Sequence, residues 1–237
     1  MKIKAFFFLW FFLFFLSCSE IPPKPEISGE QKLSPPVLEM FGYARCSNCP
    51  EVEEALDQLK TVYEDSIIVI QYHLRLLGDT LSPEEVNVRA NFYNVDNIAP
   101  VTFINGIQKI TGAPDSAYVT FHNYFWNAKR NPIIFDMKID TADETLSINI
   151  TIPDTILIDP SDSLYVIATI DSIYFAQPGA PDSMFNNVAK FIHSQKLERI
   201  NQIYVPLSII NRKSNLNIFI QSSSSREIKS ALTLKGG

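Results

Sequence analysis

Two cysteines separated by two residues carry the chemistry that this sequence suggests first. Cys46 and Cys49 lie between an apolar run at 37–43, which predicts a strand, and an amphipathic stretch at 50–63, which predicts a helix. The unpaired N–H groups and the dipole at a helix N-terminus stabilise a thiolate, and Arg45 adds a positive charge beside it. We therefore expect Cys46 to be the nucleophile. Cys49, about one turn inside the helix, would resolve a mixed disulfide formed at Cys46.

The residues alone leave three interpretations of this pair open: redox exchange, a stable disulfide without turnover, and half of a zinc site. Zinc is the least favoured, because the chain has no second cysteine pair of this spacing and His73 is the one candidate for a third ligand. We expect no metal and no cofactor. At the end of the second predicted strand, His73 could support the cysteines or simply cap the strand edge. His122 and His193 are interpreted as structural residues without partners.

The elements that must position the cysteines follow the order β-α-β-α-β-β-α between Val37 and Lys129. Ser82-Pro83-Glu84-Glu85 offers an N-cap, a proline at the first helical position and a capping-box glutamate, so we predict a helix from there to about Tyr93. Asn105-Gly106 predicts a tight hairpin turn. The remaining elements are a strand at 67–74, hairpin strands at 101–104 and 107–110, and a helix at 114–128.

After Asn131 the pattern changes to short alternating strands with polar turns, which is typical of an antiparallel β-sandwich. The expected strands are 135–139, 146–152, 164–170, 172–176, 200–207, 216–221 and 227–234, while 187–193 fits either strand or helix. The sequence therefore predicts an α/β domain over 37–130 followed by an all-β sandwich domain over 131–237.

Pro100 is a second sign, independent of the cysteines. It follows Ile98-Ala99 and precedes Val101-Thr102-Phe103-Ile104. With this proline and the cysteine pair together, the chain resembles the thioredoxin superfamily. The resemblance implies a thioredoxin-like fold and a cis Ala99–Pro100 bond packed against the cysteines. It also implies a groove in which Ala99 offers backbone hydrogen bonds to a peptide substrate.

A narrower resemblance rests on Val37-Leu38-Glu39-Met40-Phe41 followed by Cys46-Ser47-Asn48-Cys49-Pro50. These segments, and the β-rich C-terminal half, are similar to thioredoxin-like proteins of the Omp28-related outer-membrane group. Two positions depart from thioredoxin itself: Arg45 stands where thioredoxins have Trp, and Met40 stands where they carry a buried acid. Glu39 should point to the other face of the strand. The resemblance therefore implies the fold more strongly than it implies a general dithiol reductase.

The N-terminus has the pattern of an export signal. Lys2 and Lys4 precede an apolar run at 5–16, which is too short for the hydrocarbon core of about 30 Å. The run ends in Phe15-Leu16-Ser17-Cys18, which resembles the lipobox of bacterial lipoproteins. An ordinary signal peptide cleaved nearby is the alternative.

We expect a signal peptide at 1–17, an acylated Cys18 that anchors the chain in the bilayer, and a mobile Pro-rich tether at 18–36. Ser19 after the cysteine favours the outer membrane, by resemblance to Gram-negative sorting rules. The net charge of -6 argues against a nucleic-acid partner. The sequence thus predicts an envelope lipoprotein that exchanges thiols and disulfides with extracytoplasmic client proteins. The alternative is a non-catalytic binding or scaffold lipoprotein with a static disulfide and a β-sandwich interaction surface.

Overall fold

The computed structural model describes residues 32–236. The predicted signal peptide, the predicted lipidation site at Cys18 and most of the predicted tether lie outside the described residues. The tether residues that are described, 32–36, pack onto the folded body. The Ser34 amide donates to the Asn131 carbonyl oxygen (2.8 Å), and Ser34 Oγ accepts a hydrogen bond from the Ala231 amide (2.9 Å). The folded body therefore extends N-terminally beyond the expected boundary at 37.

The chain is a mixed α/β protein in which a large β-sheet carries few helices. Helix α1 begins at the cysteine pair, has Pro50 in its first turn, and buries Val52 and Leu56. Helix α2 begins at Val86, later than expected. Ser82 does not cap it, because Ser82 Oγ accepts a hydrogen bond from the His73 amide (3.0 Å). The helices are α1 Cys49–Tyr63, α2 Val86–Tyr93 and α3 Ala117–Asn127, with 3₁₀ turns η1 Glu64–Ser66 and η2 Leu207–Ile209.

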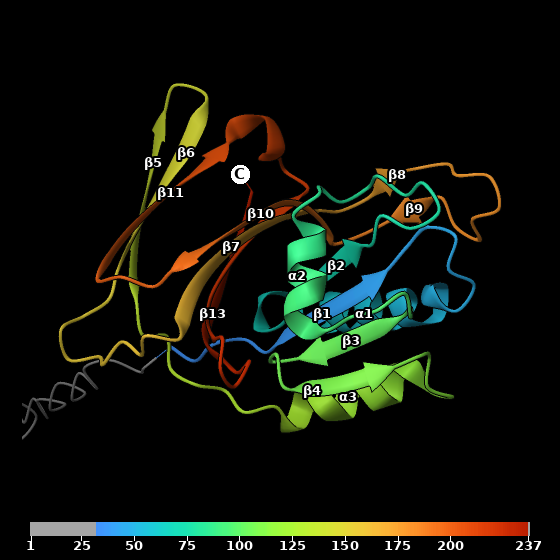
Figure 1. Ribbon diagram of the computed structural model, residues 1–237, viewed down its shortest axis with the longest axis horizontal. Helices are drawn as coiled ribbons and strands as arrows, with labels where there is room; N and C mark the ends of the chain where they lie inside the picture. Colours follow the sequence, from blue (N-terminus) through green and yellow to red (C-terminus); the bar gives the residue numbers. More distant parts are fainter. Residues whose placement is uncertain (1–31, 237) are drawn as a thin grey trace, which may run out of the picture. The chain divides into compact units, whose positions relative to one another are not determined.

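The large sheet has the strand order β13-β12-β7-β10-β2-β1-β3-β4 in the described residues (Figure 1). Its strands are β1 Val37–Gly42, β2 Ile68–His73, β3 Val101–Ile104, β4 Gln108–Thr111, β7 Asp162–Ile170, β10 Val188–Lys196, β12 Ser214–Ser222 and β13 Ile228–Lys235. Strands β1 and β2 are parallel, β3 runs antiparallel to β1, and β4 antiparallel to β3. Strand β10, in the region that could have been strand or helix, joins the two halves of the sheet where Val188 lies opposite Gln71.

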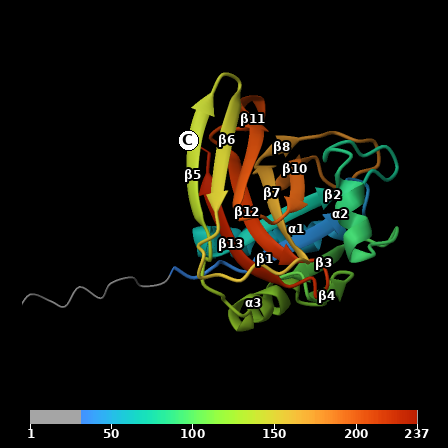
Figure 2. The same ribbon diagram turned by 60° about the vertical axis from the view of Figure 1, so that its left-hand side comes forward.

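A smaller sheet, with the order β11-β6-β5, packs against the C-terminal strands of the large sheet (Figure 2). Its strands are β5 Asp136–Ala142, β6 Thr145–Thr151 and β11 Ile200–Pro206. Ile148 and Ile150 of β6 share a core cluster with Val166 and Ile218 of the large sheet. The alternation predicted for 146–152 is therefore confirmed. The strand predicted at 172–176 is reduced to β8 Ile173–Tyr174, which pairs with β9 Met184–Phe185.

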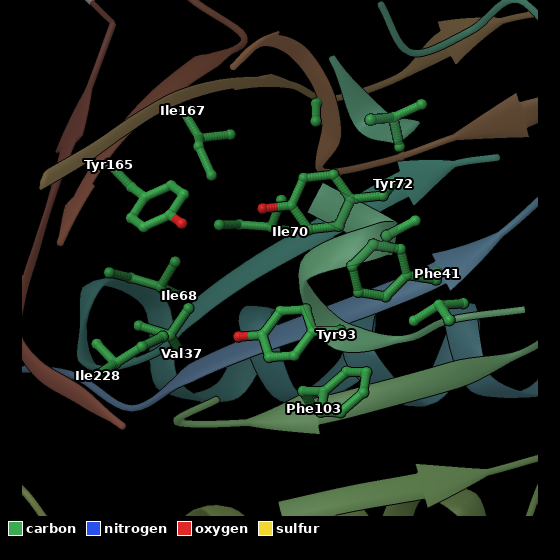
Figure 3. Packing of buried hydrophobic residues seen from close by; sticks show 14 of the residues in the cluster. Val37, Phe41, Ile68, Ile70, Tyr72, Tyr93, Phe103, Tyr165, Ile167 and Ile228 are labelled. Atoms are coloured by element: carbon green, nitrogen blue, oxygen red, sulfur yellow. The ribbon is translucent and has the colours of Figure 1, made fainter. Parts of the chain in front are cut away.

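The two faces of the large sheet carry different helices. Helices α1 and α3 pack on one face. The core cluster there includes Leu38, Met40, Cys46, Cys49 and Phe121. On the other face, beside α2, side chains of β1, β2 and β3 meet Tyr165, Ile167 and Ile228 of the C-terminal strands (Figure 3). The described parts of the two predicted domains, 37–130 and 131–236, thus share one sheet and one core cluster and belong to one compact unit.

A buried ionic network on the α2 face also links the two ranges. Glu39 and Arg89 are both buried and form an ion pair at 2.7 Å. The Tyr72 and Tyr93 hydroxyls donate to the Glu39 carboxylate (2.7 and 2.5 Å), and Arg89 Nη1 donates to Gln221 Oε1 on β12 (2.7 Å). Burial and the Glu39 carboxylate raise the pKa of both tyrosines well above the ordinary value, so they remain donors. Glu39 therefore faces away from the cysteines, as predicted, and its carboxylate is bound by Arg89, Tyr72 and Tyr93 on the α2 face.

Candidate functional site

Cys46 and Cys49 form a disulfide at the N-terminus of α1, with their Cα atoms 5.4 Å apart. A turn closed by the Cys46 amide and the Tyr43 carbonyl oxygen (2.9 Å) brings the chain from β1 to the helix. Cys49 is the first residue of α1 and not one turn inside it, since Cys46 to Asn48 still belong to that turn. Both residues are almost covered: Cys46 is 3% exposed and Cys49 is 1% exposed. Cys46 is therefore more exposed than Cys49, as expected for the outer cysteine, but only by a small margin.

Gly42, at the end of β1, leaves the space that the disulfide occupies. A Cβ at this position would lie 3.1 Å from Cys49 Sγ and 3.2 Å from the terminal methyl of Met40. Both contacts are tighter than ordinary van der Waals distances, so a side chain here would push against the sulfur and the methionine. Met40, in the same core cluster as the two cysteines, gives this side of the disulfide an apolar neighbour.

The Ala99–Pro100 peptide bond is cis, as the resemblance implies. Ala99 packs against the core cluster that contains Cys46 and Cys49, and Pro100 is buried at the start of β3. Ala99 and the disulfide thus share the packing layer between the sheet and helices α1 and α3. A role of Ala99 in binding peptide stays a prediction.

His73 and Asp79 form a buried pair beside the segment that leads to the cysteines. His73 Nδ1 lies 2.8 Å from Asp79 Oδ2, and the same oxygen accepts a hydrogen bond from the Ala44 amide (2.6 Å). Burial alone would raise the Asp79 pKa, but His73 and the Leu81 and Ala44 amides hold it below the ordinary value. His73 therefore acts through Asp79 on the backbone of Ala44, two residues before Cys46.

The β8–β9 hairpin, from the C-terminal range, reaches this end of the sheet. The Phe185 ring packs edge-on against His73 at a centroid distance of 4.8 Å, and Gln177 Nε2 donates to the Leu77 carbonyl oxygen (2.8 Å). A Cβ on Gly179 would lie 3.4 Å from the Arg45 guanidinium nitrogens. Arg45 is exposed. It directly precedes Cys46 in the sequence, and its guanidinium lies beside Gly179 in the loop of the β8–β9 hairpin.

A groove of about 590 Å³ runs beside α1 between Pro50, which follows Cys49, and the β8–β9 hairpin. Its wall includes Glu53 and Asp57 of α1, Gln71 of β2, Asp182 before β9, and Phe185 of β9. Burial, and then the charges of Asp57, Asp182 and Asp79, raise the pKa of Glu53 to about 8. Sequence reasoning missed this groove, because its residues come from segments more than a hundred positions apart.

His122 and His193, interpreted from the sequence as structural residues, each lie beside a polar side chain. The interpretation of His122 and His193 as residues without partners was wrong. His122 Nε2 lies 2.7 Å from the Tyr63 hydroxyl, and His193 Nε2 lies 3.2 Å from Gln195 Oε1. Over residues 32–236, no three His, Cys, Asp or Glu side chains converge as metal ligands, and no helix is long and apolar enough to cross a membrane.

Comparison with known proteins gives a fold but no family. No family model and no curated protein matches the chain. A crystal structure of a protein from Agrobacterium tumefaciens is similar over 87% of this chain and 96% of that one, with 18% identity and a TM-score of 0.59. HBP35 of Porphyromonas gingivalis is similar over 86% of this chain and 75% of that one, with 14% identity and a TM-score of 0.61. At these identities the likeness concerns the arrangement of the backbone alone.

Proposed function

We propose that this chain is a thioredoxin-like protein that performs thiol–disulfide exchange on extracytoplasmic proteins through Cys46 and Cys49. One observation carries the proposal: the disulfide lies at the N-terminus of α1, beside the central strand β1, in the same packing layer as the cis Ala99–Pro100 bond. The β-α-β-α-β-β-α order and the strand order β2-β1-β3-β4 support a thioredoxin-like part. The two facing sheets support a sandwich for the remainder.

The exchange needs two steps. A client thiolate attacks Cys46 Sγ, forming an intermolecular S–S bond and expelling Cys49 as a thiolate. A second client thiolate then attacks the client sulfur of that bond and expels Cys46. The client loses two electrons and two protons to become a disulfide, while the pair gains them as two thiols. In the reverse direction Cys46 attacks a client disulfide and Cys49 resolves the product. Unpaired N–H groups at the start of α1 would stabilise the Cys46 thiolate in both directions.

The proposal also includes a place in the cell. The predicted signal and lipobox would make the chain an acylated lipoprotein of the bacterial envelope, comparable to the Omp28-related group. Mass spectrometry of the mature N-terminus is the check. A fatty-acylated Cys18 would support the anchor, and an unmodified terminus at another residue would remove it.

A static disulfide is the second candidate, and the burial of both cysteines favours it. At 3% and 1% exposure, the sulfurs offer an incoming thiol little surface unless the neighbouring segments move. In that case the protein would be a binding or scaffold protein whose disulfide only ties the turn to α1.

Equilibration with glutathione buffers of graded potential, read out by alkylation of free thiols, separates the two candidates. Redox exchange predicts a potential within the range of known oxidoreductases, about -120 to -270 mV, together with activity on a disulfide client such as insulin that is lost in Cys46→Ser. A pair that stays oxidised below about -300 mV and acts on no client would exclude exchange.

A further inference from the structure

The groove beside α1 contains polar groups that the protein itself leaves without partners. Gln71 is 2% exposed, and neither its Nε2 nor its Oε1 has a hydrogen-bond partner among the described residues. Glu53, also on the wall of the groove, is 9% exposed. A buried carboxamide that makes none of its hydrogen bonds costs free energy, so this pair of side chains is suited to a ligand.

Among the described residues, four carboxylates line the groove and no lysine or arginine does: Glu53, Glu54, Asp57 and Asp182. The charges of Asp57 and Asp182, and of Asp79 beyond the groove wall, each oppose the ionisation of Glu53. Asp57 is already held by the Asn186 and Asn187 amides, at 2.7 and 3.0 Å. The groove therefore contains a surplus of carboxylates, and a positive charge is what would relieve it.

Apolar side chains complete the wall. Val62, Tyr118, Met184 and Phe185 line the groove together with the polar groups. A ligand with an aliphatic stem and a charged end would use both kinds of surface. The ammonium would pair with the Glu53 carboxylate and donate to Gln71 Oε1, since both side chains line the groove.

We propose that this groove binds a lysine side chain of the client polypeptide. The assignment rests on the proposed exchange function, because it places the lysine near the cysteine that exchanges: Pro50 lines the groove directly after Cys49, and Glu53 is one helical turn further along α1. A metal ion fits less well, since the acidic side chains do not converge as a ligand set in the described residues. An anion would meet the carboxylates of Glu53, Asp57 and Asp182 and no cationic side chain of the groove wall in the described residues.

The first experiment needs no redox chemistry. The disulfide form is titrated with n-butylammonium, the lysine side-chain analogue, or with n-butanol, and the Gln71 side-chain amide and the Glu53 carboxyl carbon are followed by NMR at pH 7. Ammonium should bind at least about tenfold more tightly than the alcohol, with release of a proton from Glu53. Glu53→Gln should lower ammonium affinity at least about tenfold, and the matched control Glu51→Gln, an exposed position on α1 outside the groove wall, should change it less than about twofold. Equal binding of both probes, or an unchanged Gln71 signal, would overturn the site.

The second experiment tests the client. Two peptide disulfides that differ only by lysine or norleucine near the cysteine are compared as exchange substrates. The lysine peptide should react with at least about fivefold higher kcat/KM, and Glu53→Gln should abolish this preference, whereas the control Glu51→Gln should retain it. Equal rates on both peptides would overturn the client assignment. Ammonium binding without exchange on either peptide would overturn the exchange function and leave a cation site that serves no client.

Discussion

At the scale of single residues, Glu53 illustrates how a side chain suited to binding weakens the unliganded fold. Its pKa is about 8 in the folded chain against an ordinary value of 4.5. Below the ordinary value of 4.5 the folded and the unfolded chain both hold the Glu53 proton, so Glu53 does not reduce the free energy of unfolding. Between the two values the unfolded chain releases the proton and the folded chain keeps it. Stability is therefore lost as pH rises through the folded pKa, and the loss is complete above it.

Glu53→Gln should remove this dependence. Gln resembles the protonated carboxyl, so wild type and variant should be about equally stable at pH 4. Above pH 8 the variant should be more stable by a few kcal/mol, at about 1.4 kcal/mol per pKa unit. Urea unfolding at a series of pH values measures the difference, and Glu51→Gln is the control. A difference that does not change with pH would show that Glu53 titrates normally.

Asp79 has the opposite behaviour, because its partners stabilise the ionised form. Its pKa lies below the ordinary value, so its contribution to stability is present above that value and is lost as pH falls through the folded pKa. Asp79→Asn would place an amide donor against the Ala44 amide or His73. We expect the free energy of unfolding to fall by about 2 to 4 kcal/mol at pH 7, and this loss should shrink as pH falls below the ordinary value of 3.8.

The same variant tests whether the His73–Asp79 pair positions the cysteines. Loss of the Ala44 contact should loosen the turn, so the disulfide should be reduced by dithiothreitol several times faster than in wild type. Asp96→Asn, at an exposed position before β3, is the control. An unchanged reduction rate in a destabilised Asp79→Asn would limit the pair to a structural role.

At the scale of elements, the β8–β9 hairpin lies where it can restrict access to the disulfide. The Phe175 amide donates to the Ser183 carbonyl oxygen (2.8 Å), so the loop at 176–182 can be replaced by Asn-Gly without changing the pairing of β8 and β9. The shortened loop lacks the Gly179 approach to Arg45. We expect the free energy of unfolding to change by no more than about 1 kcal/mol. The rate at which dithiothreitol reduces the disulfide should rise several-fold. A slower reduction would mean that the loop assists the exchange instead of shielding it.

Local patterns predicted the elements around the cysteines well, since α1, β1 and β3 depend on apolar periodicity and on Pro50 and Pro100. The start of α2 was predicted wrongly, because Ser82 bonds to His73 and not to the helix. The hairpin, the groove and the Glu39–Arg89 network could not be predicted, because each joins residues distant in sequence that no periodicity relates. Gln71 fits an apolar strand pattern poorly, and that mismatch was the one available signal for the groove.

At the scale of the whole described body, the question is whether residues 32–130 fold alone. The thioredoxin-like domain that we propose would be expected to do so, whereas the structure places side chains of the C-terminal strands inside the core of this range. Arg89 donates to Gln221, and its guanidinium lies 4.3 Å from the Tyr165 ring centroid and 5.3 Å from that of Phe219. Without those strands the Arg89 guanidinium would lose its hydrogen bond to Gln221 and the two rings that cover it. An incompletely paired charge in the core would lower the free energy of unfolding.

We therefore expect a chain of residues 32–130 to lack a cooperative unfolding transition, whereas 32–236 should unfold in one. Circular dichroism in urea distinguishes the two. Within the longer chain, Gln221→Ala should cost about 1 to 3 kcal/mol, because it leaves Arg89 Nη1 and the Tyr93 hydroxyl short of a partner. Gln202→Ala, a change of the same kind on β11 away from the network, is the control. A cooperatively folded 32–130 fragment would mean that the Glu39–Arg89 pair is stable without its C-terminal cover, and that the β-rich half is an attachment that the cysteine site does not need.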